Sequence, residues 1–306
     1  MTGVDRETGK KTAVGCANVV TMTAVGTMRR GKPPGERGGG MGSLLIGGGL
    51  ALAMIIGCSA APSSFHPADP LAPADFSHRA FDGILRSSVI NGSVNYPAIQ
   101  KDRRFIEYLA QLDRVDPSVL PVEERLAFWI NAYNAFAIDG ILRGETPRPY
   151  VGWYRYFKLR EYGVGGVRLN LYDLEHAVLR RHFNEPRVHF AIVCASRSCP
   201  KLQSGAYDGG MIQRQLDQAA REFINDPVRN RFDRAGKVAR LSRIFDWFEE
   251  DFVAAAGGVL PYVGRYVADP ELARELASVP YRIEYLDYDW SLNGIPPEEV
   301  SRAGAP

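Results

Sequence analysis

The longest predicted helix covers residues 121–143 and is apolar on nearly every side. Pro121 suits a first helical position, and Glu123 and Glu124 suit the positive end of the helix dipole. Gly144 suits the position where the helix ends. Because a helix that is hydrophobic all round must be shielded from water on every side, this segment is predicted to be buried at the centre of the fold.

A hairpin and a second helix are predicted next along the chain. Strand-like segments over 156–162 and 167–171 flank a glycine-rich turn over 163–166, a pattern typical of an antiparallel hairpin. Asn170 is placed to cap the N-terminus of a helix over 171–182.

The rest of the chain mixes helices and strands without regular alternation. The predicted elements are a strand over 189–194, a helix over 211–224, a strand over 238–241, a helix over 243–255 that Ser242 caps, a helix over 270–277 and a strand over 281–288. This order favours an α+β fold, in which several helices of a single globular domain pack on a small, mostly antiparallel sheet. The domain is expected over 76–295, with a C-terminal tail over 296–306.

The N-terminal residues have the pattern of a secretion signal. Residues 43–57 form an uncharged, mostly apolar run, too short to span a bilayer comfortably, with a basic flank ahead of it. The run ends in Gly57-Cys58, which resembles a bacterial lipobox in which Cys58 becomes the first mature residue and carries the lipid. The alternative is an ordinary N-terminal membrane anchor with an unrelated cysteine.

These features predict the organisation and location of the N-terminal part. Residues 1–57 are expected to be a signal region, with 1–27 an over-extended start, and residues 58–75 a lipidated cysteine followed by a flexible linker rich in Pro, Ala and Ser. Ser59 resembles the sorting pattern for the outer membrane. We therefore expect a chain that is lipid-anchored to the outer membrane, faces the periplasm and has the membrane as a partner.

The charge of the mature chain argues against a nucleic-acid partner. The full sequence has 37 Lys and Arg and 35 Asp and Glu residues, a formal net charge of +2. Removing the seven basic and three acidic residues of the signal region leaves 30 and 32, a net charge of −2. Because no basic stripe remains, nucleic-acid binding is excluded.

Two of the four cysteines remain as a pair in the predicted domain, Cys194 and Cys199. A lone pair in an exported protein is most often a disulfide. Their Cα atoms must then lie about 4.4–6.8 Å apart, whereas five extended residues would span ~17 Å. The segment between them is therefore predicted to turn sharply, and its small polar residues permit this.

Five motifs of the sequence are distinctive: Leu126–Phe136, Leu171–Arg180, His189–Pro200, Leu241–Phe252 and Tyr288–Asn293. In this order, through most of residues 76–293, they resemble a bacterial and plant family called domain of unknown function 547. The Asn131–Asn134 and Cys194 motifs are the most specific of them. This family has no settled activity, so the resemblance implies no substrate.

The helix over 121–143 contains two asparagines that project to the same side, Asn131 and Asn134. A buried amide without hydrogen bonds costs about 1–3 kcal/mol, so these side chains need partners. They either fix backbone groups of neighbouring strands or line a polar pocket together with Tyr133.

His176 is the candidate general base on the helix over 171–182. Glu175 is adjacent, but neighbouring residues of an α-helix point about 100° apart, so the two are not expected to act as an oriented pair. His176 either joins a surface ion network with Asp173 and Arg180 or faces the cysteines as a base for a thiol.

His189 and Cys194 are expected on opposite faces of the predicted strand and ~16 Å apart along it. His189 could then act only on its own face. A nucleophilic Cys194 or Cys199 would need a base, for which His176 is available, or the positive charge of Arg197. The C-x4-C spacing without paired histidines does not favour a metal site, and no cofactor is predicted.

Three functions are compatible with these residues. The first is binding of an unknown ligand or envelope protein through a pocket framed by the Cys194–Cys199 turn, with Asn131, Tyr133, Asn134, Glu175 and Arg197 as binding residues. The second is a cysteine-dependent hydrolase or transferase acting on peptide-like substrates, with Cys194, Cys199, His176 and His189 as catalytic residues. Thiol–disulfide exchange is the least favoured, because the chain lacks a C-x-x-C motif.

Overall fold

A computed structural model of the chain describes residues 69–298. The predicted signal region, the predicted lipidation site at Cys58 and the predicted linker as far as residue 68 lie outside the described residues. Among helices within 69–298, none has both the length and the hydropathy needed to cross a membrane. Leu71, in the predicted linker, donates a backbone hydrogen bond to the carbonyl oxygen of Arg114 at 2.9 Å.

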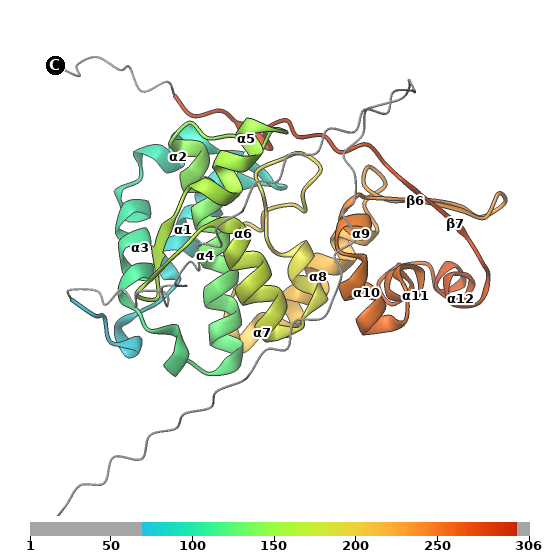
Figure 1. The fold of residues 1–306 in the computed structure, drawn as a ribbon, viewed down its shortest axis with the longest axis horizontal. Helices are drawn as coiled ribbons and strands as arrows, with labels where there is room; N and C mark the ends of the chain where they lie inside the picture. The colour runs from blue at the N-terminus through green and yellow to red at the C-terminus, as the bar shows by residue number, and fades with distance from the viewer. Residues whose placement is uncertain (1–68, 299–306) are drawn as a thin grey trace, which may run out of the picture. The chain divides into compact units, whose positions relative to one another are not determined.

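The first half of the described chain is mainly helical (Figure 1). Its elements are α1 (Arg79–Ser88), β1 (Val89–Ile90), β2 (Ser93–Asn95), α2 (Tyr96–Lys101), α3 (Arg103–Arg114), α4 (Val122–Leu142), α5 (Val151–Tyr154), the π-helix η3 (Arg155–Leu159), β3 (Tyr162–Val164) and β4 (Val167–Leu169). Helices α1 to α3 are not among the elements predicted from sequence.

The second half contains shorter helices and one ribbon of strands. Its elements are α6 (Leu171–Asp173), the π-helix η4 (Leu174–Arg180), α7 (Arg181–Phe183), the 3₁₀-helix η5 (Pro186–Phe190), α8 (Ile212–Ile224), β5 (Arg231–Asp233), β6 (Val238–Leu241), α9 (Ile244–Trp247), α10 (Glu249–Ala256), α11 (Val259–Gly264), α12 (Pro270–Ser278), β7 (Arg282–Tyr285) and β8 (Gly294–Ile295). The short 3₁₀ turns elsewhere connect these elements.

Helix α4 is the buried centre of the larger group of helices, as its sequence predicts. It begins directly after Pro121, which is its N-cap, and every residue from Leu126 to Ile141 is buried. Helices α2 and α3 and the segment of α6 and η4 pack against it, and α1 packs on α2 and α3 (Figure 1). Together they form the first hydrophobic core.

A second hydrophobic core lies between α8, the segment α9–α12 and the ribbon of β6 and β7. Helices α9–α12 follow one another beside this ribbon (Figure 1). Phe190, at the end of η5, belongs to this core, whereas Val188 and Ala191 belong to the first core. The segment around His189 therefore lies where the two cores meet.

Within residues 69–298 the strands form three small sheets, with the orders β1-β2-β8, β3-β4 and β5-β6-β7. Three of the five strand pairs are antiparallel, and β2 with β8 and β6 with β7 are parallel. The α+β class is confirmed, and the sheet content is distributed over three sheets.

The predicted hairpin forms with a shorter first strand. Residues 155–159 are a π-helix, so the prediction of a strand starting at 156 is wrong. The hydroxyl of the buried Tyr156 donates a hydrogen bond to the carbonyl oxygen of Ala137 in α4, at 2.8 Å, which ties this turn to the central helix. Strands β3 and β4 then pair around Gly165 and Gly166, whose positive φ values make the turn.

The strand predicted over 189–194 is also wrong. Pro186 begins the 3₁₀-helix η5, and the residues after Phe190 form turns. The side chain of Asn134 donates to the carbonyl oxygen of Ala191 at 3.0 Å and accepts from the amide of Val193 at 2.9 Å. One buried amide thus satisfies backbone groups that a neighbouring strand would otherwise satisfy.

The helices predicted over 211–224 and 270–277 are confirmed as α8 and α12, and those predicted over 171–182 and 243–255 form with changes in their interior. Residues 171–183 are helical and Asn170 caps them, accepting from the amide of Asp173 at 2.8 Å, but the middle is the π-helix η4. The helix predicted over 243–255 is divided at Phe248 into α9 and α10. Both changes occur in segments that contribute residues to the site.

Candidate functional site

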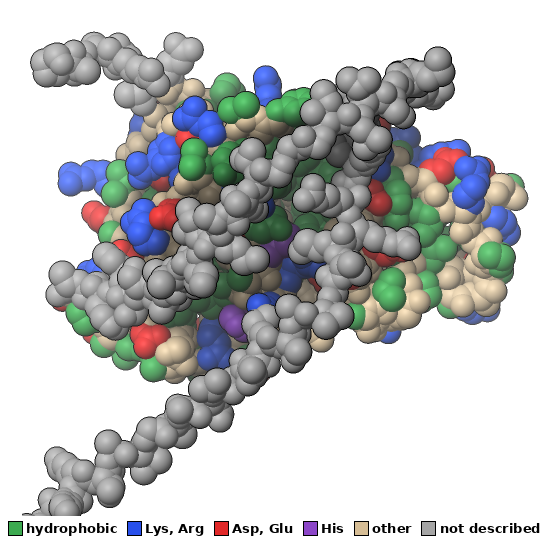
Figure 2. Space-filling view, viewed as in Figure 1, with side chains coloured by type: hydrophobic (Ala, Val, Ile, Leu, Met, Phe, Trp, Pro, Cys, Tyr) green, Lys and Arg blue, Asp and Glu red, His purple; other side chains and the backbone are tan. Residues whose placement is uncertain are grey.

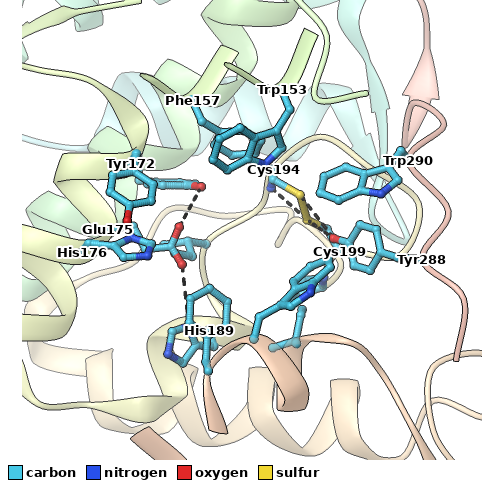
Figure 3. Close-up of a pocket in the computed structure, with 16 residues that line it drawn as sticks. Trp153, Phe157, Tyr172, Glu175, His176, His189, Cys194, Cys199, Tyr288 and Trp290 are labelled. Atoms are coloured by element: carbon cyan, nitrogen blue, oxygen red, sulfur yellow. Dashed lines mark hydrogen bonds and ion pairs between the residues drawn. A yellow bond between two sulfur atoms is a disulfide. The ribbon is translucent and has the colours of Figure 1, made fainter. Parts of the chain in front are cut away.

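A cavity of about 350 Å³ is lined by residues of both cores (Figure 3). The lining residues are Tyr133, Trp153, Phe157, Tyr172, Glu175, His176, His189, Ile192, Cys194, Cys199, Pro200, Ile244, Trp247, Phe248, Tyr288 and Trp290. Half of them are Phe, Tyr or Trp. On the face shown in Figure 2, a histidine side chain is visible among hydrophobic side chains near the middle of the described surface.

Four side chains form what we call the charged cluster: Glu175, Arg180, His189 and Asp251. The Nε2 atom of His189 lies 2.7 Å from Oδ2 of Asp251. Arg180 donates two hydrogen bonds to the same carboxylate, at 2.7 and 2.9 Å. The Nδ1 atom of His189 lies 3.8 Å from Oε1 of Glu175, whose carboxyl group points into the cavity (Figure 3).

The His189 ring is buried and is held in one orientation. It is 2% exposed and stacks on Phe248, with the ring centroids 4.0 Å apart. Burial lowers the pKa of His189, although the hydrogen bond with Asp251 opposes this shift. The neutral ring therefore donates its Nε2 proton to Asp251, and Nδ1, which has no hydrogen-bond partner among the described residues, is left as an acceptor.

The two carboxyl groups of the charged cluster differ in their protonation. Burial raises the pKa of Glu175 to about 7, and the charge of Arg180 and a hydrogen bond of 3.5 Å from the Tyr133 hydroxyl offset this only in part. Burial also acts to raise the pKa of Asp251, but the hydrogen bonds from His189 and Arg180 outweigh it and hold that pKa well below its ordinary value. At neutral pH Asp251 is therefore ionised, while Glu175 exchanges readily between its two forms.

His176 lines the cavity beside this cluster. Its ring stacks on Tyr172 with the centroids 3.9 Å apart, and the Nζ atom of Lys158 lies 3.7 Å from the Tyr172 ring centroid. Burial, assisted by the nearby charge of Arg180, lowers the pKa of His176 to about 4. The imidazole is therefore neutral at physiological pH.

Four further residues form what we call the sulfur cluster: Cys194, Ser196, Cys199 and Tyr288. Cys194 and Cys199 form a disulfide with their Cα atoms 6.2 Å apart, which confirms the predicted pairing and the sharp turn. Ser196 donates a hydrogen bond to the Tyr288 hydroxyl at 3.0 Å, and that hydroxyl donates to the Sγ atom of Cys199 at 3.2 Å. All of these groups are neutral.

The turn of the sulfur cluster is also attached to the segment 289–293 through the backbone. The amide of Arg197 donates to the carbonyl oxygen of Ser291 at 2.8 Å, and the amide of Asn293 donates to that of Ala195 at 3.1 Å. Ala195 itself has the left-handed backbone conformation, with φ of 62°. Several interactions besides the disulfide therefore hold the turn in place.

Of the three binding residues predicted on α4, one lines the cavity and two do not. Tyr133 lines the cavity, but Asn131 and Asn134 do not. Asn131 donates to the carbonyl oxygen of Tyr207 at 2.7 Å and accepts from its amide at 2.9 Å, and Asn134 bonds the backbone after η5. Their assignment to the binding site is corrected: both fix the backbone of irregular segments.

The other candidates are brought together more closely than the sequence predicts. Glu175, His176, His189, Cys194 and Cys199 all line one cavity. The expected separation of His189 from Cys194 assumed a strand that does not form. The expected divergence of Glu175 and His176 did not keep them apart: both lie on the π-helix η4 and both line the cavity.

Two further predictions about charged residues are corrected. Arg197 is exposed and does not line the cavity, so it is not placed to bind a ligand there or to activate a thiol within it. His176 does not join a surface network, because Asp173 bonds Asn170 and Arg180 bonds Asp251.

Asp251 and most of the aromatic lining are absent from the residues predicted from sequence. Asp251 is 62 residues away from His189 along the chain, and no spacing rule connects a 3₁₀-helix to a distant α-helix. The available signal was its position in the motif Leu241–Phe252, and likewise the motif Tyr288–Asn293 contains Trp290. Within residues 69–298, no group of three or more His, Cys, Asp and Glu side chains has a geometry suited to a metal ion.

Comparison with known proteins finds similarity to a family of unknown function. No curated protein and no solved structure matches the chain. A family model matches residues 117–224, a segment that includes α4, η4, η5 and the disulfide turn. Over this segment the chain is similar to the family described as "Protein of unknown function, DUF547", which supports the resemblance seen in its motifs.

Proposed function

We propose that the domain binds a small ligand with an aromatic or apolar body in the cavity framed by the Cys194–Cys199 turn. The observation that carries this proposal is the composition of the cavity: half of its lining residues are Phe, Tyr or Trp, and only Glu175, His176 and His189 among them carry an acidic or basic group. Ligand sites are typically concave and mostly apolar, with a small number of polar groups that orient the ligand. Here Glu175 and His189 supply those groups.

Tryptophan fluorescence tests this proposal directly. Three of the four tryptophans, Trp153, Trp247 and Trp290, line the cavity, and the fourth, Trp129, is buried in the first core. We expect members of a panel of small aromatic compounds to change the emission in a saturable manner. If no compound in such a panel binds the folded protein, the proposal is wrong.

A pair of variants localises the binding. Trp290→Ala removes a lining ring, and we expect it to weaken the binding of any compound found. Tyr150→Ala removes an aromatic ring that is 89% exposed and does not line the cavity, so it serves as the matched control. Equal effects of the two substitutions would place the binding site elsewhere.

The proposal includes the location expected from the sequence, lipid attachment at Cys58 and exposure to the periplasm at the outer membrane. The lipobox-like sequence before Cys58 supports it, and a disulfide fits an oxidising compartment. Expression in a bacterium with metabolic labelling by a fatty acid tests it. Cys58→Ser should abolish both the label and the recovery of the protein in the membrane fraction, and a labelled Cys58→Ser protein would contradict the proposal.

One observation favours a second candidate, a cysteine-dependent hydrolase or transferase: both sulfur atoms share the cavity with His176 and His189. A dithiol reductant would convert the disulfide to two thiols and itself become oxidised. A histidine would take the proton of one freed thiol, and the resulting thiolate would attack an acyl carbonyl to form a thioester while the histidine passes that proton to the leaving group. Water or another acyl acceptor would then cleave the thioester and restore the thiol. After reduction, rapid alkylation of one thiol at neutral pH, slowed in His189→Ala, would support this candidate, and slow alkylation of both thiols would exclude it.

A further inference from the structure

Glu175 has an unusual environment for a carboxyl group inside a protein. The residue is 8% exposed. The only hydrogen bond of its carboxyl group among the described residues is the long one from the Tyr133 hydroxyl. The nearest basic nitrogen is Nδ1 of the neutral His189, at 3.8 Å. Buried carboxylates are normally paired with a cation, so a positive charge is missing at this position.

Arg180 does not supply that charge, because its guanidinium is already bonded to Asp251 through two hydrogen bonds. The cluster therefore holds two carboxyl groups and one guanidinium, and its one histidine, His189, is neutral. With Glu175 ionised, one negative charge of the cluster is left without a cationic ion-pair partner among the described residues, since the Lys158 ammonium lies on the Tyr172 ring.

The aromatic rings around Glu175 favour the same type of ligand group. Trp153, Trp247, Tyr288 and Trp290 line the cavity, and the faces of such rings attract cations. One lining ring, Tyr172, already has a cation of this chain on its face, since the Lys158 ammonium lies 3.7 Å from the ring centroid. A carboxyl group without a partner and several aromatic rings therefore face one space.

We propose that the ligand carries an organic ammonium group, which lies among the aromatic rings of the cavity and pairs with the carboxylate of Glu175. This inference rests on the proposed function and makes it specific: the apolar body of the ligand fills the cavity, and its positive charge lies next to Glu175. A quaternary ammonium meets both requirements through its charge alone, because it has no N–H group that needs a hydrogen-bond acceptor.

The proposal is tested with two compounds of the same shape and different charge. The probes are phenyltrimethylammonium and its neutral isostere tert-butylbenzene, titrated into the purified protein at concentrations at which both dissolve and followed by tryptophan fluorescence. We expect the cation to bind about tenfold more tightly than the neutral compound, a ratio typical of cation–π contacts together with an ion pair. Equal affinities, or tighter binding of the neutral compound, would overturn the proposal.

The Glu175→Gln variant assigns the preference to one side chain. We expect it to reduce the affinity for the cation about fivefold, which is the ion-pair share of the preference, and to leave the affinity for the neutral compound unchanged. Glu161→Gln is the matched control, because the Glu161 side chain is 55% exposed and lies outside the cavity. An unchanged cation preference in a folded Glu175→Gln protein would overturn the assignment.

A ring variant keeps the proposal testable if Glu175→Gln fails to fold. Trp247 is 46% exposed at the rim of the cavity, so Trp247→Leu should not disturb the core. We expect it to weaken binding of the cation more than binding of the neutral compound, and equal weakening would count against the ammonium assignment. Binding of the neutral compound alone would overturn the ammonium assignment and leave the proposed function standing, whereas binding of neither compound would overturn both.

The pH dependence gives an independent measurement. The Lys158 ammonium on η3 lies near this site, on the ring of Tyr172. The other titratable and charged groups around Glu175 are Tyr133 on α4, His176 and Arg180 on η4, His189 on η5, Asp251 on α10 and Tyr288 after β7. Of these only Glu175 has a pKa near 7, and an incoming cation favours its ionised form. Affinity for the cation should therefore rise between about pH 6 and pH 8 with release of a proton, and a flat profile would overturn the pairing with Glu175.

Discussion

The charged cluster and the sulfur cluster face the same cavity but are held together in different ways. In the charged cluster, His189 and Arg180 share the carboxylate of Asp251, so each group depends on a partner from another element. In the sulfur cluster, neutral hydrogen bonds and a disulfide act on a turn that backbone contacts with residues 289–293 also hold.

This difference predicts how each cluster responds to substitution. Removing one member of the charged cluster leaves a buried partner without a hydrogen bond, which is costly in a low-dielectric environment. Removing one member of the sulfur cluster leaves a turn that is still attached at other points. The effects should also depend on pH in the charged cluster and not in the sulfur cluster.

The largest effect is expected for Asp251→Ala. It removes the acceptor for both His189 and Arg180, and we expect the free energy of unfolding to fall by about 3 kcal/mol at pH 7. Because the pKa of Asp251 is depressed in the folded state, its contribution is present above the ordinary carboxyl pKa and is lost as pH falls through the folded pKa. Urea unfolding at several pH values measures both features.

Asp246→Ala is the control for Asp251. The Asp246 side chain is 37% exposed and pairs with Arg243 at 2.9 Å, so its loss should cost about 1 kcal/mol or less. If the two substitutions lower the free energy of unfolding equally, the interactions of Asp251 with His189 and Arg180 contribute no more than a surface ion pair.

Glu175→Gln should have the next largest effect on the free energy of unfolding, but it should stabilise the protein where Asp251→Ala destabilises it. The folded state retains the Glu175 proton up to a pKa of about 7, whereas the unfolded chain releases it near the ordinary value of 4.5. This group alone therefore makes the wild-type protein less stable as pH rises between these values, by about 3 kcal/mol in total. The variant should be more stable than wild type at about pH 8, and the two should be similar below about pH 4.

The quantity to measure is the difference in the free energy of unfolding between Glu175→Gln and wild type. This is because the buried histidines change stability with pH in the opposite direction to Glu175. Burial lowers the pKa of His78 and of His176 to about 4, so their contributions to stability rise with pH between about 4 and 6.5. These contributions cancel when Glu175→Gln is subtracted from wild type. A difference that does not change with pH would show that Glu175 ionises normally in the folded protein.

Replacing the disulfide tests the sulfur cluster. The double substitution Cys194→Ser, Cys199→Ser should lower the free energy of unfolding by about 2 kcal/mol, the value expected for so short a loop on the chain-entropy model. The loss should be equal at pH 5 and pH 8, because no titrating group is involved. A loss that varies with pH would mean that the sulfur cluster and the charged cluster are coupled.

The sequence predicted those features of the fold that depend on residues close together along the chain, and it failed where distant residues determine the structure. The buried helix α4 follows from its own apolar composition, and the disulfide follows from the presence of a single cysteine pair in the predicted domain. The segment 189–194 is apolar like a strand, but the backbone of Ala191 bonds to the side chain of Asn134, 57 residues earlier. Hydrophobic periodicity cannot predict such a partner.

The candidate site shows the same limit. The cysteines and histidines were recognisable from the sequence as candidate catalytic groups. The carboxylate that orients His189, however, comes from the distant helix α10. The π-helix that contains Glu175 also has no simple sequence signature. The aromatic lining comes from separate segments, of which α5 and the residues after β7 contribute Trp153 and Trp290. Only the three-dimensional packing brings them to one cavity.

The smallest expected effect is that of Tyr288→Phe, which removes the hydroxyl that accepts from Ser196 and donates to Cys199. We expect a loss of about 1 kcal/mol in the free energy of unfolding, the usual net value of a neutral hydrogen bond. Burial raises the pKa of Tyr288 well above its ordinary value, so the loss should be constant from pH 5 to pH 9. Tyr150→Phe, at an exposed ring, controls for the loss of a hydroxyl, and thermal unfolding of both variants gives the comparison. If Tyr288→Phe costs as much as the loss of the disulfide, the hydroxyl and not the covalent bond is the main attachment of the turn.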